Sequence, residues 1–179
     1  MYFNNPGKEN TEKTIELAIK TAKEKGIKHI VVASTNGSTA RLLKDSQLDV
    51  TVVTHVYGFK EPGKQEMLDE TRKELESYSF KIYAGTHVLS GAERAISNNF
   101  GGVNPIEIIA HSLRMFGQGV KVAVEISTMA LDAGLIPYDE DIIAIGGSKN
   151  GADAAVIIKP AHASSIFDTK VKEIICKPL

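Results

Sequence analysis

The sequence lacks several residues and patterns that mark specialised proteins. Its 179 residues include a single cysteine, Cys176, and no tryptophan. One cysteine excludes an intramolecular disulfide framework and a metal site built from cysteines alone. Lysine and arginine together number 21 against 22 acidic residues, which gives a net charge of −1. Because no basic patch stands out, nucleic acid and anionic membranes are not expected partners.

Long apolar segments are also missing. The longest apolar runs, such as Ile142–Ile145, are far too short to span a bilayer. The first residues, Met1–Gly7, have no basic region followed by an apolar one, so we expect no secretory signal and a cytoplasmic protein. A chain of this length suits one domain with a substantial core, and we predict a single α/β domain over residues 1–179.

Helix-like and strand-like periodicities alternate along the chain. Strands are expected at 29–34, 50–55, 80–83, 142–146, 154–159 and, as a weak edge strand, 171–176; helices are expected at 11–25, 38–45, 64–78, 105–116 and 120–133. The last helix is ambiguous, because Val120, Val122 and Val124 alternate as in a strand, and its length decides for a helix. This alternation predicts a mostly parallel sheet covered by helices on both faces.

Local signals refine this arrangement. Gly147–Gly151 is too short for a helical crossover, so strands 142–146 and 154–159 should form an antiparallel hairpin. Asn104 followed by Pro105 and Glu107 predicts a capped helix start. Ser90 and Glu93 match a capping box, which predicts another helix start.

The loop after the first of these strands has the clearest chemical signal. It consists of Ser34, Thr35, Asn36, Gly37, Ser38 and Thr39. Its hydroxyls could bond a phosphate, Gly37 would let the backbone turn and approach a ligand closely, and a helix start would offer free amides. It is not a Walker loop, because the glycine–lysine–threonine ending is absent. The alternative is a helix cap on an empty turn; we favour an anion site because capping needs only one such residue.

Ligands of such sheets bind at the carboxyl ends of the strands, which nominates further residues. The candidate ligand contacts there are His55, Gly58, Phe59, Thr86, His87, Gly146, Gly147 and Ser148. Phe59 could instead anchor its loop, and Gly146–Gly151 could be a simple flexible turn. His55, His87 and His162 would bind a metal only if they converged; no two have the short spacing of a zinc site, so we predict none.

The segment Ile30–Arg41 resembles the first strand, loop and helix of the pyruvate kinase C-terminal domain, in which such a loop holds a phosphate of a sugar bisphosphate. Val122–Ile126, Asp132–Ile136 and Gly151–Ala155 resemble more closely the stand-alone archaeal proteins related to that domain. The resemblance implies a three-layer α/β/α fold with five strands, one antiparallel strand at the edge of the sheet, FMN as cofactor and a homo-oligomer.

Two functions follow as hypotheses. The first is binding of a phosphate-bearing small molecule, FMN before others, at the Ser34–Thr39 loop, with catalysis and a redox role left undecided. The alternative is a regulatory module without catalysis that senses a sugar phosphate. The 179 residues leave no room for the pyruvate kinase barrel of about 250 residues, so phosphoryl transfer from phosphoenolpyruvate is not expected. No Gly-x-Ser-x-Gly motif of a hydrolase is present.

Overall fold

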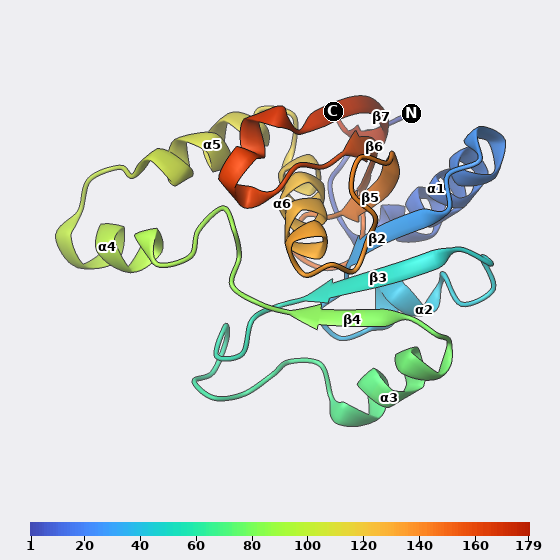
Figure 1. Cartoon of the computed structure of the whole chain (residues 1–179), viewed down its shortest axis with the longest axis horizontal. Helices are drawn as coiled ribbons and strands as arrows, with labels where there is room; N and C mark the ends of the chain where they lie inside the picture. Colours follow the sequence, from blue (N-terminus) through green and yellow to red (C-terminus); the bar gives the residue numbers. More distant parts are fainter.

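A computed structural model describes all 179 residues as one sheet flanked by helices (Figure 1). The strands are β1 (Tyr2–Phe3), β2 (His29–Ala33), β3 (Asp49–Thr54), β4 (Lys81–Ala84), β5 (Ile142–Gly146), β6 (Ala154–Lys159) and β7 (Lys170–Pro178). They lie in the order β1-β7-β6-β5-β2-β3-β4. Strand β6 runs antiparallel to both of its neighbours, and all the other pairings are parallel.

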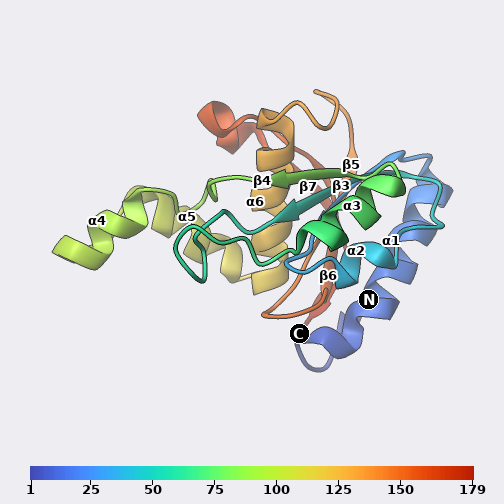
Figure 2. The same cartoon turned by 90° about the horizontal axis from the view of Figure 1, so that it is seen from below.

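The helices form the two outer layers. They are α1 (Thr11–Lys25), α2 (Ser38–Arg41), α3 (Asp69–Ser77), α4 (Glu93–Phe100), α5 (Pro105–Arg114) and α6 (Gln118–Asp132), with 3-10 turns at Lys8–Asn10 and Ala163–Asp168. Figure 2 shows the sheet between α6 on one side and α1 on the other. None of these helices has the length and apolar character needed to cross a membrane.

Alternation along the strands creates a core on each face of the sheet. In β2, Ile30 and Val32 pack in the cluster that contains Ile15 and Ala18 of α1, whereas Val31 packs in the cluster formed with α6. Successive strand side chains point to opposite faces, so a run of apolar residues serves both layers. The continuous apolar run that predicted a buried strand here is thereby explained.

The strand order places a topological switch point between β2 and β5, in the middle of the sheet. The chain passes outward through β2, β3 and β4 and then returns to form β5 on the other side of β2. The loops after β2 and β5 therefore leave neighbouring parallel strands in opposite directions, which is the switch point where ligands bind in such sheets.

Several expectations are confirmed and two concerning the sheet are wrong. The hairpin of β5 and β6, the helix over 120–133 and the Asn104 capping box are all present. The sheet has seven strands rather than five, and its antiparallel strand β6 is internal. Residues 171–176 form a strand as expected, within the longer β7; β6 pairs with these residues, whereas β1 pairs with β7 only at Lys177 and Pro178. The amino-terminal strand β1, which had no periodic signal, covers only the carboxyl end of β7.

Three helix predictions are wrong in their boundaries. The Ser90–Glu93 capping box does not form, since α4 begins at Glu93 without a side-chain cap. Helix α2 ends at Arg41, although residues up to Ser46 continue as turns. Helix α3 begins at Asp69 rather than at 64, because the preceding residues fold back on β3: the Gln65 side-chain amide donates to the His55 carbonyl at 2.8 Å.

Candidate functional site

An open cleft of about 1320 Å³ lies at the carboxyl edge of the sheet. Its walls come from the loops after β2, β3 and β5 and from residues near the starts of α1 and α6. Only four of its 23 lining residues are hydrophobic. Such a lining suits a polar, hydrogen-bonding ligand more than a purely apolar one.

The Ser34–Thr39 loop is shaped by its own side chains. The Ser34 hydroxyl accepts a hydrogen bond from the Ala40 amide at 3.4 Å, and the Asn36 side-chain oxygen accepts one from the Ser38 amide at 3.1 Å. The Thr54 hydroxyl of β3 donates to the Thr35 carbonyl at 3.1 Å. These bonds hold the loop in one conformation, so Ser34 and Asn36 act as structural members of it.

The same loop has polar groups with no partner in the chain. Among the residues that line the cleft, the backbone amides of Thr35, Asn36 and Thr39 donate no hydrogen bond, and the hydroxyls of Thr35, Ser38 and Thr39 also have none within the protein. We call these groups, on Thr35, Asn36, Ser38 and Thr39, the anion nest. Clustered amides of this kind form an anion-binding concavity. Since α2 has only four residues, the separate amides and hydroxyls, more than a helix dipole, define its chemistry.

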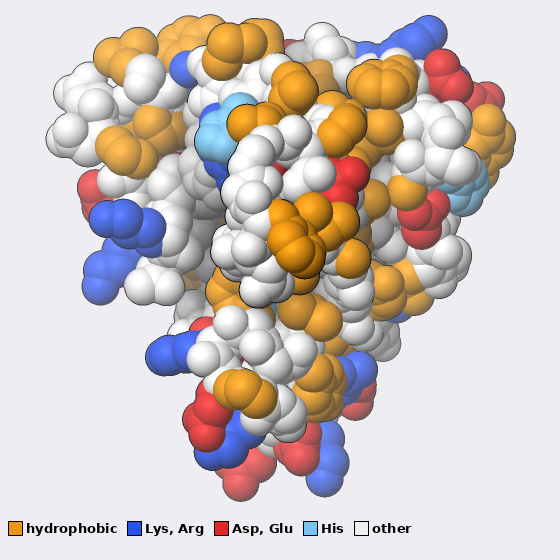
Figure 3. All heavy atoms as spheres, turned by 90° about the vertical axis from the view of Figure 1, so that its left-hand side faces the viewer, with side chains coloured by type: hydrophobic (Ala, Val, Ile, Leu, Met, Phe, Trp, Pro, Cys, Tyr) orange, Lys and Arg blue, Asp and Glu red, His pale blue; other side chains and the backbone are white.

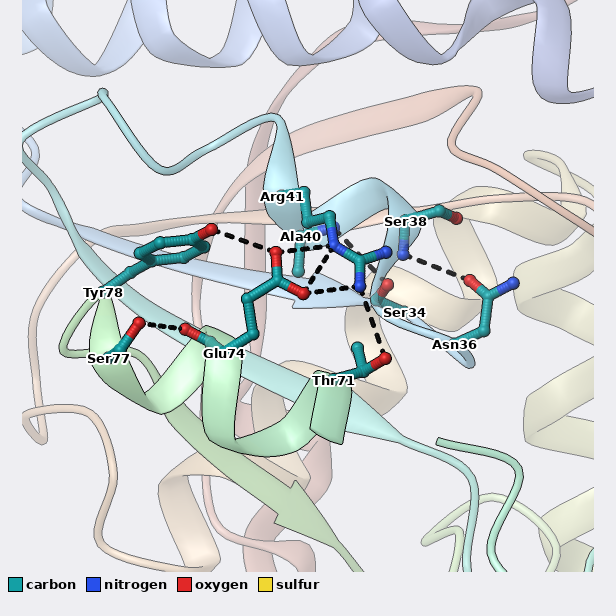
Figure 4. A network of polar contacts seen from close by, with 9 residues as sticks. All are labelled: Ser34, Asn36, Ser38, Ala40, Arg41, Thr71, Glu74, Ser77 and Tyr78. Atoms are coloured by element: carbon teal, nitrogen blue, oxygen red, sulfur yellow. Dashed lines mark hydrogen bonds and ion pairs between the residues drawn. The ribbon is translucent and has the colours of Figure 1, made fainter. Parts of the chain in front are cut away.

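The loop rests on a clamp between α2 and α3 (Figure 4). The Arg41 guanidinium bonds the Glu74 carboxylate at 2.6 and 2.9 Å and the Thr71 hydroxyl at 3.3 Å, and Tyr78 donates to Glu74 at 3.0 Å. These bonds lower the pKa of Glu74, with Arg41 as the largest cause. Arg41 is thereby engaged away from the nest, and an anion there would be held without it.

Gly37 forms the expected turn, and it packs against α3. It adopts a left-handed conformation with φ of 87°, and a Cβ at this position would lie 2.4 Å from the Thr71 methyl carbon. Gly37 is buried against α3 and does not line the cleft. A glycine is therefore required by the turn and by the close packing of the loop on α3.

The glycine turn after β5 forms the opposite wall of the cleft. Gly147, Lys149, Asn150 and Gly151 line it. Gly146 does not, because it is packed against α6: a Cβ there would lie 2.2 Å from the Gly119 carbonyl oxygen. The Ser148 amide is also engaged, since it donates to the buried Asp153 carboxylate at 3.2 Å.

A histidine and an aromatic ring lie beside the nest. His55 Nδ1 lies 2.6 Å from a Glu66 carboxylate oxygen, and the His55 ring stacks on Phe59 with 3.9 Å between centroids. Both rings line the cleft, and His87 packs against them with centroids 5.4 to 5.6 Å away. Burial is the largest cause that lowers the pKa of His87. This cluster offers a flat aromatic surface at the cleft wall.

The cleft thus gathers part of the predicted set. Ser34, Thr35, Asn36, Ser38, Thr39, His55, Phe59 and Gly147 line it, whereas Gly37, Gly58, Thr86, His87, Gly146 and Ser148 do not. His162 pairs instead with Asp132 at 2.7 Å. Because β6 runs antiparallel, the residues that follow it leave the opposite edge of the sheet, so the three histidines do not converge.

Some positions that line the cleft gave no usable signal in the sequence. Lys8, Thr11 and Glu12 line the cleft from the start of α1, as do Gln118 and Val122 from α6. The sequence analysis nominated only residues that follow strands. In a parallel α/β fold, the starts of the helices lie at the same edge of the sheet as the carboxyl ends of the strands.

Two buried carboxylates, those of Glu125 and Asp153, form hydrogen bonds with segments next to the cleft. Lys121 and Glu125 form an ion pair of 2.6 Å within α6, with both side chains less than 8% exposed, and Glu125 also accepts from the Leu89 amide at 3.0 Å. Burial lowers the pKa of Lys121 and raises the pKa of Asp153. Asp153 also accepts from the Gly7 amide at 3.1 Å, which ties the amino terminus to the glycine turn. Glu125 is buried within α6, so it is neither a solvated nor a capping acid.

Comparison with known proteins agrees with this architecture. Residues 12–158 match the family model described as pyruvate kinase, alpha/beta domain. The chain belongs to that family. Among solved structures, a pyruvate kinase from Cryptosporidium parvum is 18% identical, with a TM-score of 0.40 over 77% of this chain and 20% of that one. The same organism's enzyme in complex with ADP is 17% identical, with a TM-score of 0.41 over 82% and 22%. The chain spans about one fifth of those enzymes.

Proposed function

We propose that this protein binds a phosphate-bearing small molecule, FMN before others, with its phosphate in the anion nest. The single observation that carries the proposal is the set of three amides and three hydroxyls without partners, on Thr35, Asn36, Ser38 and Thr39. Unpaired donors beside a cleft lose little by accepting an anion, because they exchange water for charge-assisted hydrogen bonds.

The rest of the cleft suits the remainder of such a ligand. Phe59 is 47% exposed and its stacked partner His55 lies beside it, which offers a flat surface for an aromatic ring system. Lys8, Lys60 and Lys149 line the cleft without forming an ion pair in the protein, and they favour an anionic ligand. FMN would supply flavin redox chemistry when bound, while these residues would hold and orient it.

The first experiment is a titration of FMN against riboflavin by calorimetry, together with the absorbance spectrum of the isolated protein. We expect FMN to bind and riboflavin, which lacks the phosphate, to bind at least tenfold more weakly. FMN at a hundred times its dissociation constant should stabilise the fold by about 2.7 kcal/mol. Equal affinity for the two flavins would remove the role of the nest. Reduction of bound flavin by NADH or NADPH would then test a redox activity.

The second candidate is a regulatory module without catalysis that binds a sugar phosphate. The small share of hydrophobic residues in the cleft lining favours it, because sugar hydroxyls require hydrogen-bonding walls. A thermal-shift comparison of FMN with sugar bisphosphates separates the two candidates. Stabilisation by the sugar bisphosphates alone would support the module and exclude the flavin.

A further inference from the structure

Exposed apolar side chains gather at the edge of the sheet that holds the cleft. Sixteen large hydrophobic residues are exposed in the whole chain. Nine of them lie in segments that follow β3 and β4: Tyr57, Phe59, Leu68, Ile96, Phe100, Val103, Ile108, Met115 and Phe116. Isolated exposed apolar residues are ordinary, but such a concentration on one side marks an interaction surface.

Six of these side chains belong to residues 93–116, which form α4 and α5 and which we call the arm. The arm projects away from the sheet on the side toward which β3 and β4 point (Figures 1 and 2). Its first helix, α4, buries no residue. Polar bonds join it to α5: Glu93 accepts from the Ile106 amide at 3.0 Å, and Asn104 donates to the Ser97 hydroxyl at 2.7 Å.

A helix of eight residues is marginal in water without packing. The apolar residues of α4 nevertheless remain uncovered, with Ile96 47% and Phe100 83% exposed, and Val103 in the following loop is 73% exposed. Viewed toward this side of the molecule, hydrophobic side chains appear in several groups among polar ones (Figure 3). We conclude that α4 is built to pack against something outside its own chain.

The exposed area is of the size that a stable contact needs. The six side chains of the arm are 47 to 83% exposed. At roughly 150–200 Å² for a side chain of this size, they present about 600–700 Å². A standard interface buries about 800 Å² on each partner, so the arm and the neighbouring Tyr57 and Phe59 together suffice for one face of a dimer.

We propose that the occupant is a second copy of this chain, docked edge to edge so that each arm lies over the other copy's cleft. Arm and cleft share one edge of the sheet, so a single two-fold axis can satisfy both contacts at once and close the assembly. The arm's formal charges balance, with Glu93 and Glu107 against Arg94 and Arg114, which gives no attraction to an anionic membrane.

The cleft itself has few apolar side chains to cover a ligand, and the partner's arm would supply them. Small-molecule pockets bury most of their ligand behind mainly hydrophobic walls, whereas this cleft is open and polar. The partner's Phe100 and Val103 would add an apolar cover. This part of the inference rests on the proposed ligand binding; the pairing of two copies does not.

The first test measures oligomeric state by size-exclusion chromatography with light scattering, without ligand. We expect a dimer for the natural chain and a monomer for the double variant Phe100→Asp with Val103→Asp. Phe167→Asp is the matched control, because Phe167 is 85% exposed and lies outside the arm; it should remain dimeric. A monomeric natural protein, or a dimer that survives the arm variants, overturns the proposal. So does recovery of a monomer that binds anionic vesicles.

The second test locates the arm on its partner. Cys176 is buried, so Phe100→Cys in one copy and Lys60→Cys at the cleft in another can be joined by a short bismaleimide. We expect a covalent dimer only when the two variants are mixed, and its absence overturns the placement over the cleft. FMN affinity is measured separately. A dimer that binds no FMN would contradict the proposed FMN binding but not the pairing of two copies. A monomer that binds FMN would contradict the pairing but not the FMN binding.

Discussion

The Ser34–Thr39 loop and the middle of α6 differ in whether their polar groups have partners within the protein. In the loop, the amides of Thr35, Asn36 and Thr39 and three hydroxyls have no partner and lie beside an open cleft. In α6, Lys121 and Glu125 are buried and satisfy each other at 2.6 Å. Buried polar groups need partners because their desolvation is costly, whereas groups beside water do not.

The difference indicates which polar residues serve structure and which are available for a ligand. Changes in the α6 pair should alter the stability of the fold, and changes in the nest should alter binding with little effect on stability. The following experiments are ordered from the largest expected effect to the smallest. Each tests the distinction between residues that stabilise the fold and residues that are available for a ligand.

Lys121→Met should have the largest effect. It leaves the Glu125 carboxylate buried without its cation, which typically costs about 3–5 kcal/mol. Urea unfolding followed by circular dichroism measures the loss. The double change Lys121→Met with Glu125→Gln keeps an acceptor for the Leu89 amide and should lose clearly less. A loss below about 1 kcal/mol for the single variant would mean that the pair is not isolated from water.

Gly37→Ala tests the packing beneath the nest. A left-handed conformation costs a non-glycine residue about 1–2 kcal/mol, and the new methyl would also meet Thr71. We expect a total of about 2–4 kcal/mol once overpacking is included. Gly63→Ala is the matched control, with φ of 73° and no atom within 4 Å of the added carbon. Equal losses in the two variants would show that the contact with Thr71 adds nothing.

Thr35→Val and Ser38→Ala each remove one unpaired hydroxyl of the nest. If these groups bind the phosphate, each change should weaken FMN binding about tenfold, as expected for a bond to a charged group of about 1.5 kcal/mol. Stability should change by no more than about 0.5 kcal/mol. Ser164→Ala, an exposed hydroxyl outside the cleft, serves as the control in the same titration. Unchanged affinity in both nest variants would place the ligand elsewhere.

The smallest effect is a pH dependence at His87. Burial lowers the pKa of His87 below its usual 6.5, so protonation favours the unfolded chain. Its contribution to stability is complete above about pH 6.5 and is lost as the pH falls toward the folded-state pKa. His87→Gln should flatten the stability profile across that window, measured by urea unfolding at several pH values. The exposed His111→Gln variant should keep the natural slope.

Much of the fold was predictable because it depends on local patterns. The apolar run of β2, the short turn between β5 and β6 and the Asn104 capping box each specify structure within a few residues. The Ser90–Glu93 pattern failed because the chain there extends into the arm, and Glu93 accepts from the Ile106 amide instead of capping α4. Strand β1 was missed because two residues carry no periodicity.

The site was predictable only in part for the same reason. The hydroxyl-rich loop after β2 was visible as a local pattern, and so were His55 and Phe59 after β3. The burial of Glu125 required knowing that α6 is covered on nearly all sides. Gly37 and Gly146 are glycines because of Thr71 and Gly119, residues far away in the chain.

The sequence by itself determined the order of strands and helices from α1 onward, the hairpin of β5 and β6 and the polar character of the Ser34–Thr39 loop, because these depend on near neighbours. Only the tertiary structure decided that the sheet has seven strands, that β6 lies inside it, and which loop residues face the cleft. Such properties depend on contacts between segments far apart in the chain, and a local pattern contains no information about which distant surface it will meet.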